Sequence, residues 1–520
     1  MISAVRNLWR LFRTGATLER TGAMLVILDE LGVTGWPRFV IRAAALPFGL
    51  FGRSGDSDLP PVARALQAMG PAYVKFGQVF STRPDILGPT IVAQLRYLQD
   101  RLPPFPMAQA RQIIEAELGP RAWQVLQDLE PPVAAASIAQ VHPAVWRSTG
   151  RKVAVKVLRP QIRERFRGDI SAFYFIAHSI EFFVPGSKRL RPSAVVGHFE
   201  GVVTTELDLR LEAAGASLFR ENSQNDPRLY VPQVYWDGTG SRLLTLEWVE
   251  GLSLDPDVLR EHGIDLSELA SRIMQTFLRH ALRDGFFHAD MHQGNLRIAP
   301  DGTLIALDFG IMGRLDPVTR RHYAEILYGF LTRNYRRVAE VHFEAGYIPA
   351  DQDVDEFAQA LRAIGEPIFG QDVSQISIAR LLAFLLEVTE RFGMETRTEL
   401  ILLQRTMVVV EGVARSLDPR MNIWEASKPV VEGWIRENLG PAQTVRDLGH
   451  TLQVLARMGP RLPGLADEVL LLAEMIRNQN LRGPLNVNVR TLPRVRLWRP
   501  VVLAFITGGA LAALIASLIG

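Results

Sequence analysis

Residues 288–310 constrain this chain more than any other part of its sequence. They read HADMHQGNLRI, pass through a turn and end in LIALDFG. Asn295 follows Asp290 by five positions, and Asp308 stands directly before a Phe-Gly pair. Two carboxylates and an amide on short strands offer oxygen ligands, which suit Mg²⁺ better than a softer metal. The stretch therefore predicts a magnesium site.

Protein kinases use the same order and spacing for phosphoryl transfer. In kinases the first Asp orients or deprotonates the acceptor hydroxyl, the Asn holds metal, and the second Asp bridges Mg²⁺ to the nucleotide phosphates. On this pattern Asp290 is the candidate catalytic residue, and Asn295 and Asp308 are candidate metal ligands. The sequence thus predicts a phosphoryl-transfer site with ATP and Mg²⁺ as cofactors.

Composition narrows the alternatives. The 520 residues, 48% of them apolar, are enough for several cores or for one bilobal domain with extensions. A net charge of +3, with no basic stripe carrying interleaved aromatics, predicts no nucleic-acid partner. The chain has no Cys, which excludes disulfides, thiolate metal sites and a cysteine nucleophile.

The last twenty residues, 501–520, are uncharged and almost wholly apolar, which matches the length of about 20 residues that crosses a bilayer core. The basic segment 481–500 precedes them, and no acidic residue follows Glu474. This pattern predicts a single-pass inner-membrane protein whose catalytic domain faces the cytoplasm. Small residues four apart, such as Gly508 and Ala512, would allow a homodimer through this helix. A hairpin broken near Gly508, or a buried terminal helix, are the alternatives.

The amino terminus predicts an amphipathic helix. Apolar residues recur there at helical spacing, with arginines elsewhere on the helix: Ile2, Val5, Trp9 and Phe12 against Arg6, Arg10 and Arg13. Such a helix could lie on a membrane surface or pack on the domain, and the pattern favours neither.

Between the two ends, a small β-rich lobe precedes a helical one. Alternation and turn residues predict strands over 131–137, 138–146, 152–158, 231–236 and 243–248. A helix is expected over 266–283, and helical periodicity continues to about residue 480. The predicted fold class is α+β: a bilobal protein-kinase-like fold with an N-terminal helical extension, a helix-rich C-lobe and a C-terminal transmembrane segment. The expected boundaries are 1–59, 60–122, 123–251, 252–480, 481–500 and 501–520.

Lys156 lies in the apolar strand sequence VAVKVL. An unpaired ammonium in so apolar a strand is costly, so this lysine must either reach solvent or meet anions. In a kinase-like lobe a lysine at this place contacts the α- and β-phosphates and a Glu on a nearby helix.

Four signatures together resemble the UbiB family of atypical, protein-kinase-like ATPases associated with ubiquinone biosynthesis. They cover residues 60–315 densely and are the KxGQ element at Lys75, the Ala-rich loop Ala134, Ala135, Ala136 and Ser137, the ExD element Glu206 to Asp208, and residues 288–310. The sequence departs from the family at Met291 and Gln293, where Pro is common, and at Gly215, where Asn is common.

The resemblance implies roles for further residues. Lys75 should pair with Glu206 or Asp208 over the catalytic site, and all three are counted with Asp290 as catalytic. Glu212 should pair with Lys156. The Ala-rich loop, Lys156, Glu212, Glu247 and Val249 are the implied nucleotide-binding residues. Membrane lipid or a ubiquinone precursor, and enzymes of ubiquinone biosynthesis, are the implied partners.

Two other function classes stay open at this stage. One is a scaffold whose nucleotide binding organises ubiquinone-biosynthetic enzymes without phosphotransfer. The other is a small-molecule phosphotransferase like the aminoglycoside kinases, which the KxGQ and Ala-rich elements disfavour. A conventional protein kinase is not expected, because no long Ser/Thr-bearing segment and no Ala-Pro-Glu follow residue 310.

Overall fold

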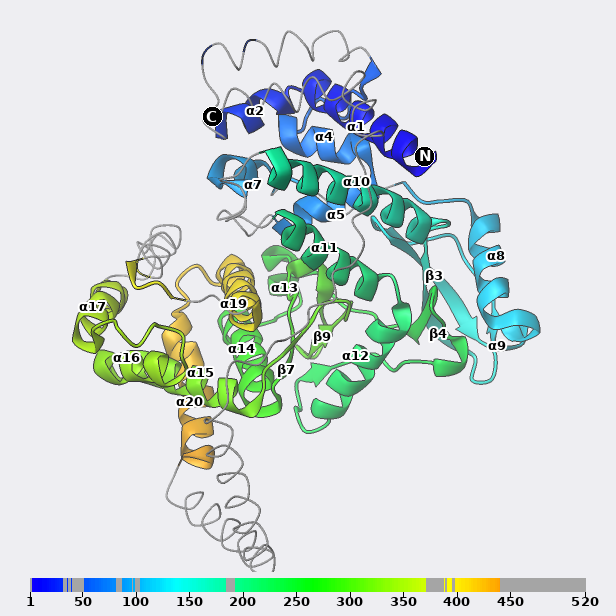
Figure 1. Ribbon diagram of the computed structural model, residues 1–520. Coiled ribbons are helices and arrows are strands. Elements are labelled where there is room, and N and C mark those ends of the chain that lie inside the picture. Colours follow the sequence, from blue (N-terminus) through cyan, green and yellow to red (C-terminus); the bar gives the residue numbers. More distant parts are fainter. Residues whose placement is uncertain are drawn as a thin grey trace, which may run out of the picture. The chain divides into compact units, whose positions relative to one another are not determined.

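The computed structural model describes residues 2–30, 35, 39, 51–80, 87–95, 97–98, 103–183, 192–370, 388, 391–394 and 398–439 (Figure 1). Within these residues the chain forms two compact units. The first unit contains Met1–Ile264 and His288–Met312, and the second contains Asp265–Phe287 and the described chain from Gly313 onward. Every described candidate site residue lies in the first unit.

The first unit is built around an antiparallel sheet in the order β1, β3, β4, β6, with β2 also pairing with β3. The strand bounds are β1 Leu126–Gln127, β2 Ala134–Ala135, β3 Ala139–Trp146, β4 Arg151–Leu158 and β6 Leu243–Glu247. The β3–β4 hairpin turns at Gly150, whose φ of +67° favours glycine. The side chains of Val153, Val155 and Val157 alternate onto one face of β4 and join the core beneath α8, Met107–Leu118. The predicted strands 138–146, 152–158 and 243–248 are therefore confirmed.

Of the predicted strand 231–236, the structure keeps only an antiparallel bridge between Val234 and Leu246 of β6. A two-residue strand, β5 Leu229–Tyr230, ends just before this segment, and a 3₁₀ turn, Trp236–Gly238, follows it. Pro232 explains the difference, because proline has no N–H to donate to a strand ladder. Strand β5 pairs in parallel with β9, Leu304–Ala306, which pairs antiparallel with β8, Leu296–Ile298. This pairing brings residues 288–312 into the first unit.

Helices of the N-terminal extension and of the lobe that follows it complete the first unit. Their bounds are α1 Ile2–Thr21, α2 Ala23–Glu30, α4 Pro61–Met69, α5 Pro71–Phe80, α7 Pro89–Leu95, α10 Ile162–Phe183 and α11 Pro192–Glu206. Helix α1 packs on α4 and α10 (Figure 1). The Thr14 and Tyr73 hydroxyls are hydrogen-bonded at 2.8 Å, and Arg10 lies 3.7 Å from Asp169. The structure thus shows the amino-terminal helix packed on the domain.

Helix α5 is fixed by aromatic packing. The Tyr73 ring meets Phe173 of α10 edge-on at 4.9 Å between centroids, and Phe76 lies 5.2 Å from Phe173 and 5.3 Å from Phe199 of α11. Gly77 faces α4 and α7, where an added Cβ would lie 2.8 Å from Leu66 of α4 and 3.2 Å from Leu95 of α7, and it would also come within 2.4 Å of Leu98. Close packing on both sides sets the direction in which Lys75 projects.

The described part of the second unit consists of helices, except for the ends of short β-strands. Helix α14, Leu266–Arg279, continues as a π-helical turn, His280–Asp284, in agreement with the helix predicted over 266–283. The later helices are α15 Pro317–Leu331, α16 Tyr335–Glu344, α17 Val354–Gly370, α19 Thr398–Leu417 and α20 Ile423–Asn438. Asp316 caps α15 by accepting from the Val318 and Thr319 amides. Tyr335, Phe357 and Phe392 lie in the core of these helices.

The remaining elements are α9 Ala122–Val125, α12 Leu209–Asn222, α13 Pro256–Glu261, β7 Phe286–His288 and β10 Met312–Arg314. Among the described residues, no helix combines the length and apolar character that crossing a membrane requires. The segments 481–500 and 501–520, predicted as a basic linker and a transmembrane helix, lie outside the described residues.

Candidate active site

Lys156 lies at the centre of a charged cluster. Its Nζ donates to both carboxylate oxygens of Glu212 at 2.8 and 2.9 Å, and to Asp308 Oδ2 at 3.1 Å. Strand β4 supplies the lysine and α12 supplies Glu212, so the pairing expected from the sequence is present. One ammonium group is shared by two carboxylates, which leaves the cluster with an excess of negative charge when both are ionised.

Burial and this excess charge shift the pKa of each group. Burial lowers the pKa of Lys156, but Asp308 and Glu212 outweigh that effect and raise it. For Asp308, burial acts upward, yet Lys156 and the Gly310 amide bring its pKa down to about 2. Burial, with the nearby Asp308 and Glu206 charges, raises the pKa of Glu212 to about 7 in spite of Lys156. At neutral pH, Lys156 and Asp308 are therefore ionised and Glu212 is partly protonated.

Asp308 is held in an unusual backbone conformation. Its φ is +54°, a left-handed value that few residues other than Gly, Asn and Asp adopt readily. The Gly310 amide donates to its Oδ1 at 3.2 Å, and the side chain stays 47% exposed. Phe309 anchors the segment, because its ring packs against Phe219 of α12 and against His288. The chain thus presents the Asp308 carboxylate outward from a fixed hydrophobic support.

Asp290 and Asn295 are linked to each other. Asn295 Nδ2 donates to the Asp290 carbonyl at 3.0 Å and lies 3.4 Å from Asp290 Oδ2. The Asp290 amide donates to Nδ1 of His288 at 3.1 Å. Because Nδ1 of the neutral ring accepts, Nε2 carries the proton and donates to the Leu307 carbonyl at 2.9 Å. His288, whose pKa burial lowers, therefore ties the Asp290 loop to the strand that leads into Asp308.

The oxygens around this loop are suited to Mg²⁺. With Nδ2 of Asn295 directed at Asp290, its Oδ1 is the atom that could approach a cation. Mg²⁺ is usually held by one or two carboxylates together with substrate phosphates and water. Asp308 and Asn295 fit that donor set. In the described chain, no group of three His, Asp or Glu residues forms a metal site made of protein ligands alone.

The Ala-rich loop forms the start of the β2–β3 hairpin. Ala134 and Ala135 pair with Val141 and Gln140, and the Ala136 amide donates to the Ala139 carbonyl at 2.8 Å. Ser137 is buried at the turn. A short hairpin at the first long strand of the lobe is the place where a kinase carries its glycine loop.

The KxGQ lysine is paired with the first acid of the ExD element. Lys75 Nζ lies 2.7 Å from Glu206 Oε1, and the two side chains are only 13% and 7% exposed. Asp208 does not face Lys75 in this way. Its carboxylate accepts from the Arg210 guanidinium at 2.9 and 2.6 Å and caps α12 through the Arg210 amide. Of the two acids expected as partners of Lys75, the structure shows Glu206 in that place, whereas Asp208 starts the helix that carries Glu212.

Glu247 has its carboxylate on the other side of the sheet from Lys156. Lys156 pairs with Leu244 and Val153 pairs with Glu247, so side-chain alternation sends Glu247 to the opposite face. The Tyr230 hydroxyl donates to Glu247 Oε2 at 2.7 Å, and burial with this hydrogen bond raises the pKa of Tyr230 to about 12. The Glu247 carboxylate therefore does not face Lys156, and a nucleotide-binding role for Glu247 and Val249 stays a prediction.

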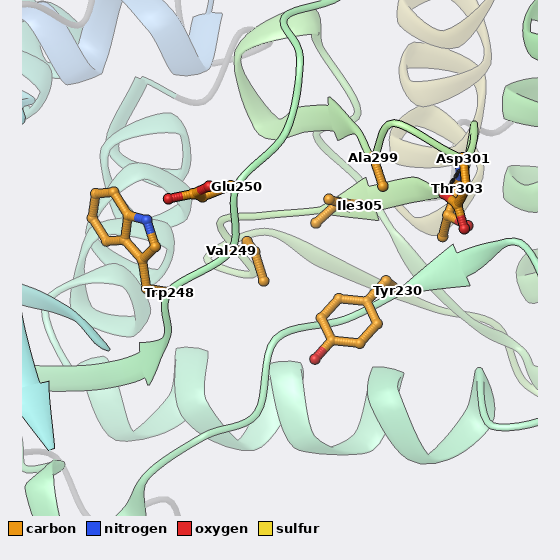
Figure 2. A pocket seen from close by; sticks show the side chains of 8 residues that line it. All are labelled: Tyr230, Trp248, Val249, Glu250, Ala299, Asp301, Thr303 and Ile305. Atoms are coloured by element: carbon orange, nitrogen blue, oxygen red, sulfur yellow. Dashed lines mark hydrogen bonds between the residues drawn. The ribbon is translucent and has the colours of Figure 1, made fainter. Parts of the chain in front are cut away.

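A shallow hollow of about 380 Å³ adjoins this segment. Figure 2 shows Val249 and Ile305 pointing into it, with Tyr230 below them and Trp248 at one end. It is completed by Glu250, Ala299, Asp301 and Thr303. The residues that line the hollow include Tyr230, the hydrogen-bond partner of Glu247, and do not include Lys156.

Three supporting arginine and tyrosine contacts were not expected from the sequence. Arg163 donates to the carbonyl of Leu207 within the ExD element at 2.7 Å, Arg210 binds Asp208, and Tyr230 binds Glu247. Of these three contacts, only that between Arg210 and Asp208 had a signal in the sequence, because an Asp directly before a helical pattern is a common N-cap. The other two bridge residues far apart in the sequence.

Models of known protein families match two parts of this chain. Residues 97–342 match the model of the ABC1 atypical kinase-like domain, and residues 361–422 match the UbiB helical domain. A solved structure of a Mycobacterium tuberculosis protein with erythromycin aligns over 63% of this chain and 83% of its own, with 27% identity and a TM-score of 0.48.

Curated relatives cover most of the chain. The "Probable protein kinase UbiB" of Marinobacter nauticus is 38% identical over 89% of this chain and 86% of its own length. The protein of the same name from Erwinia tasmaniensis is 40% identical over 77% of this chain and 75% of its own. With the lysine, glutamate and Asp-Phe-Gly geometry of an atypical kinase and relatives of this extent, the chain belongs to the UbiB family of kinase-like proteins.

Proposed function

We propose that this protein is an ATP- and Mg²⁺-dependent kinase-like ATPase that supports ubiquinone biosynthesis at a membrane. The observation that carries the proposal is the position of Lys156 between Glu212 and Asp308. This arrangement holds a cation where nucleotide phosphates would bind and leaves a half-exposed carboxylate beside it. Family membership supports the link to ubiquinone.

In this proposal each residue has a separate task. Lys156, oriented by Glu212, binds the α- and β-phosphates. Asp308 and Asn295 hold Mg²⁺, which neutralises charge on the transferring phosphoryl group. Asp290, positioned by the hydrogen bond that its main-chain amide donates to His288 Nδ1, orients the acceptor hydroxyl or water.

The acceptor is proposed to be a small molecule, lipid or water instead of a docked peptide. Only residues 311–316 separate Gly310 from α15, so the chain has no long segment there on which a peptide could dock. The buried Lys75 and Glu206 pair is proposed to restrict access to the phosphate site. We propose that the acceptor is a membrane lipid or a ubiquinone precursor, delivered at the cytoplasmic face of the inner membrane.

Replacing Asp308 tests the nucleotide site. Asn tolerates the left-handed backbone at this position, so Asp308→Asn should fold. We expect the melting temperature of the unaltered protein to rise with ATP and Mg²⁺, because a ligand that binds only the folded state stabilises it. The rise should disappear in Asp308→Asn, measured by thermal unfolding with and without both ligands.

Asp301→Asn is the matched control, since Asp301 is an exposed aspartate whose oxygens bond only to the nearby Thr303 in the contacts observed. An equal ligand-induced rise in Asp308→Asn and the control would remove Asp308 from the site. Phosphate release on anionic liposomes then separates turnover from scaffolding: nucleotide binding without release would favour the scaffold.

A further inference from the structure

Arg159 contacts the Ala-rich loop through both its main chain and its side chain. Its amide donates to the Ile138 carbonyl at 2.8 Å, and its Nε donates to the Ala136 carbonyl at 2.9 Å. Arg159 directly follows β4, three positions after Lys156. The residue therefore holds both sides of the turn that joins β2 to β3.

The same guanidinium contacts the segment that leads from the N-terminal extension into the sheet. Its Nη2 donates to the Pro103 carbonyl at 3.0 Å, and its Cζ lies 5.8 Å from the centroid of the Phe105 ring. Gln140 of β3 fixes Phe105 from the other side, accepting from its amide at 2.9 Å and donating to its carbonyl at 3.2 Å. Arg159 thus joins the loop to a segment that is itself anchored on β3.

The hydrogen bond from Arg159 to the Ala136 carbonyl restricts the whole Ala136–Ser137 peptide unit. The peptide unit is planar and trans, so the Ser137 N–H must point away from the carbonyl that Arg159 holds. Rotation of this peptide would break the bond to Arg159. The Cβ of Ala136 already narrows the backbone angles that a glycine would allow there. Arg159 and the alanine together restrict the loop to one peptide orientation.

We propose that Arg159 is a positioning residue that orients the Ala136–Ser137 peptide and thereby sets the affinity of the site for ATP relative to ADP. This inference rests on the proposed nucleotide-binding function. A loop at this place in a kinase-like lobe covers the terminal phosphates. The nucleotide with the extra phosphate therefore depends more on the orientation of the loop amides.

Arg159→Met keeps the apolar stem of the side chain and removes its hydrogen bonds. We expect its dissociation constant for ATP to rise by about fivefold, the effect of losing a net hydrogen bond, and that for ADP to rise less. Arg159→Lys, which can reach only one carbonyl at a time, should fall between Met and the unaltered protein. Calorimetric titration with each nucleotide in Mg²⁺ measures both constants.

Arg242→Met is the matched control. Arg242 is half-buried and binds Glu117 of α8 at 2.7 Å, so its loss also weakens a contact to the N-terminal extension but leaves the Ala-rich loop untouched. Hydrogen exchange of residues 134–139 gives a second measurement without nucleotide. Exchange should become faster in Arg159→Met and stay unchanged in Arg242→Met.

The outcomes separate the two hypotheses. If the unaltered protein binds neither nucleotide, the proposed function fails. If it binds both, but Arg159→Met keeps the ATP-to-ADP affinity ratio or changes it no more than Arg242→Met does, the positioning role is wrong. Should Arg159→Met not fold, the same comparison is decided by Arg159→Lys.

Discussion

The Lys75 and Glu206 pair should contribute measurably to stability because it is almost fully buried. Removing one partner of a buried ion pair leaves an uncompensated charge and costs roughly 3–5 kcal/mol. Lys75→Met should therefore lower the free energy of unfolding by about that amount, and adding Glu206→Gln should recover most of it. Urea unfolding of the two single variants and the double variant gives the coupling energy.

Lys428 and Glu432 provide the comparison on α20. They lie 3.9 Å apart, and their side chains are 59% and 36% exposed. An exposed pair of this kind contributes about 0.5 kcal/mol or less.

Purely additive effects of Lys75→Met and Glu206→Gln on the free energy of unfolding would show that the contact between these two residues does not stabilise the protein.

Glu212 should make stability depend on pH near neutrality. Its pKa is raised from 4.5 to about 7 on folding, so between these values the folded state keeps a proton that the unfolded state has released. The contribution of Glu212 is thus fully present below pH 4.5 and is lost as the pH rises through about 7. Relative to Glu212→Gln, the unaltered protein should lose of the order of 1–3 kcal/mol between about pH 5 and pH 8.

Chemical unfolding of both proteins across this pH range measures that difference. Glu117→Gln serves as the control, because burial raises the pKa of Glu117 but its contacts with Arg242 outweigh burial and lower it. Its contribution is present above the usual carboxyl pKa and so should stay constant over the same range. A constant difference for Glu212→Gln would show that Glu212 is ionised throughout.

At the scale of elements, the packing of α5 depends on Gly77. An added Cβ would lie 2.4 Å from Leu98, 2.8 Å from Leu66 and 3.2 Å from Leu95. These leucines pack in one hydrophobic cluster, so they have little room to move apart together. Gly77→Ala should therefore cost about 1–3 kcal/mol through overpacking, measured by urea unfolding.

Gly201 in α11 offers the opposite case. Nothing lies within 4 Å of an added Cβ there, so Gly201→Ala should stabilise by about 0.5–1 kcal/mol through helix propensity alone. If Gly77→Ala were as harmless as Gly201→Ala, α5 would not be tightly held against α4 and α7.

Strands and helices with local patterns could be predicted from the sequence. Alternating valines and the turn at Gly150 predicted the β3–β4 hairpin, and with it the place of Lys156. The side-chain direction of Glu247 could not be predicted, because it depends on the register between β4 and β6. The choice of Glu206 over Asp208 as the partner of Lys75 was also out of reach, since the family resemblance allowed either acid and the contact of Asp208 with Arg210 decided it.

At the scale of the whole molecule, sequence order and spatial grouping differ. The boundary expected at residue 252 put Asp290 and Asp308 with the C-terminal helices. The pairing of β5 with β9 instead gathers residues 288–312 into the first unit, together with Lys156 and Glu212. Long-range pairing between two-residue and three-residue strands leaves almost no local signal, which is why the sequence did not reveal it.

Membrane attachment is a prediction for the whole chain. Truncation before Arg482 removes the apolar residues 501–520 and most of the basic residues before them. We expect the truncated protein to leave the membrane fraction, whereas the full chain should stay there in high salt, because salt screens charge attraction but not apolar insertion. Fractionation of both proteins in low and high salt is the measurement. A truncated protein still bound in high salt would place the anchor elsewhere.

Because Lys156 is shared by two carboxylates, nucleotide binding should also be coupled to the release or uptake of protons. With its pKa raised to about 7, Glu212 is partly protonated at neutral pH. A ligand that changes the charge beside Asp308 and Lys156 would shift that pKa, so protons would be released or taken up as the ligand binds. The heat of binding should then include the heat of protonating the buffer, and it should differ between phosphate and Tris at the same pH.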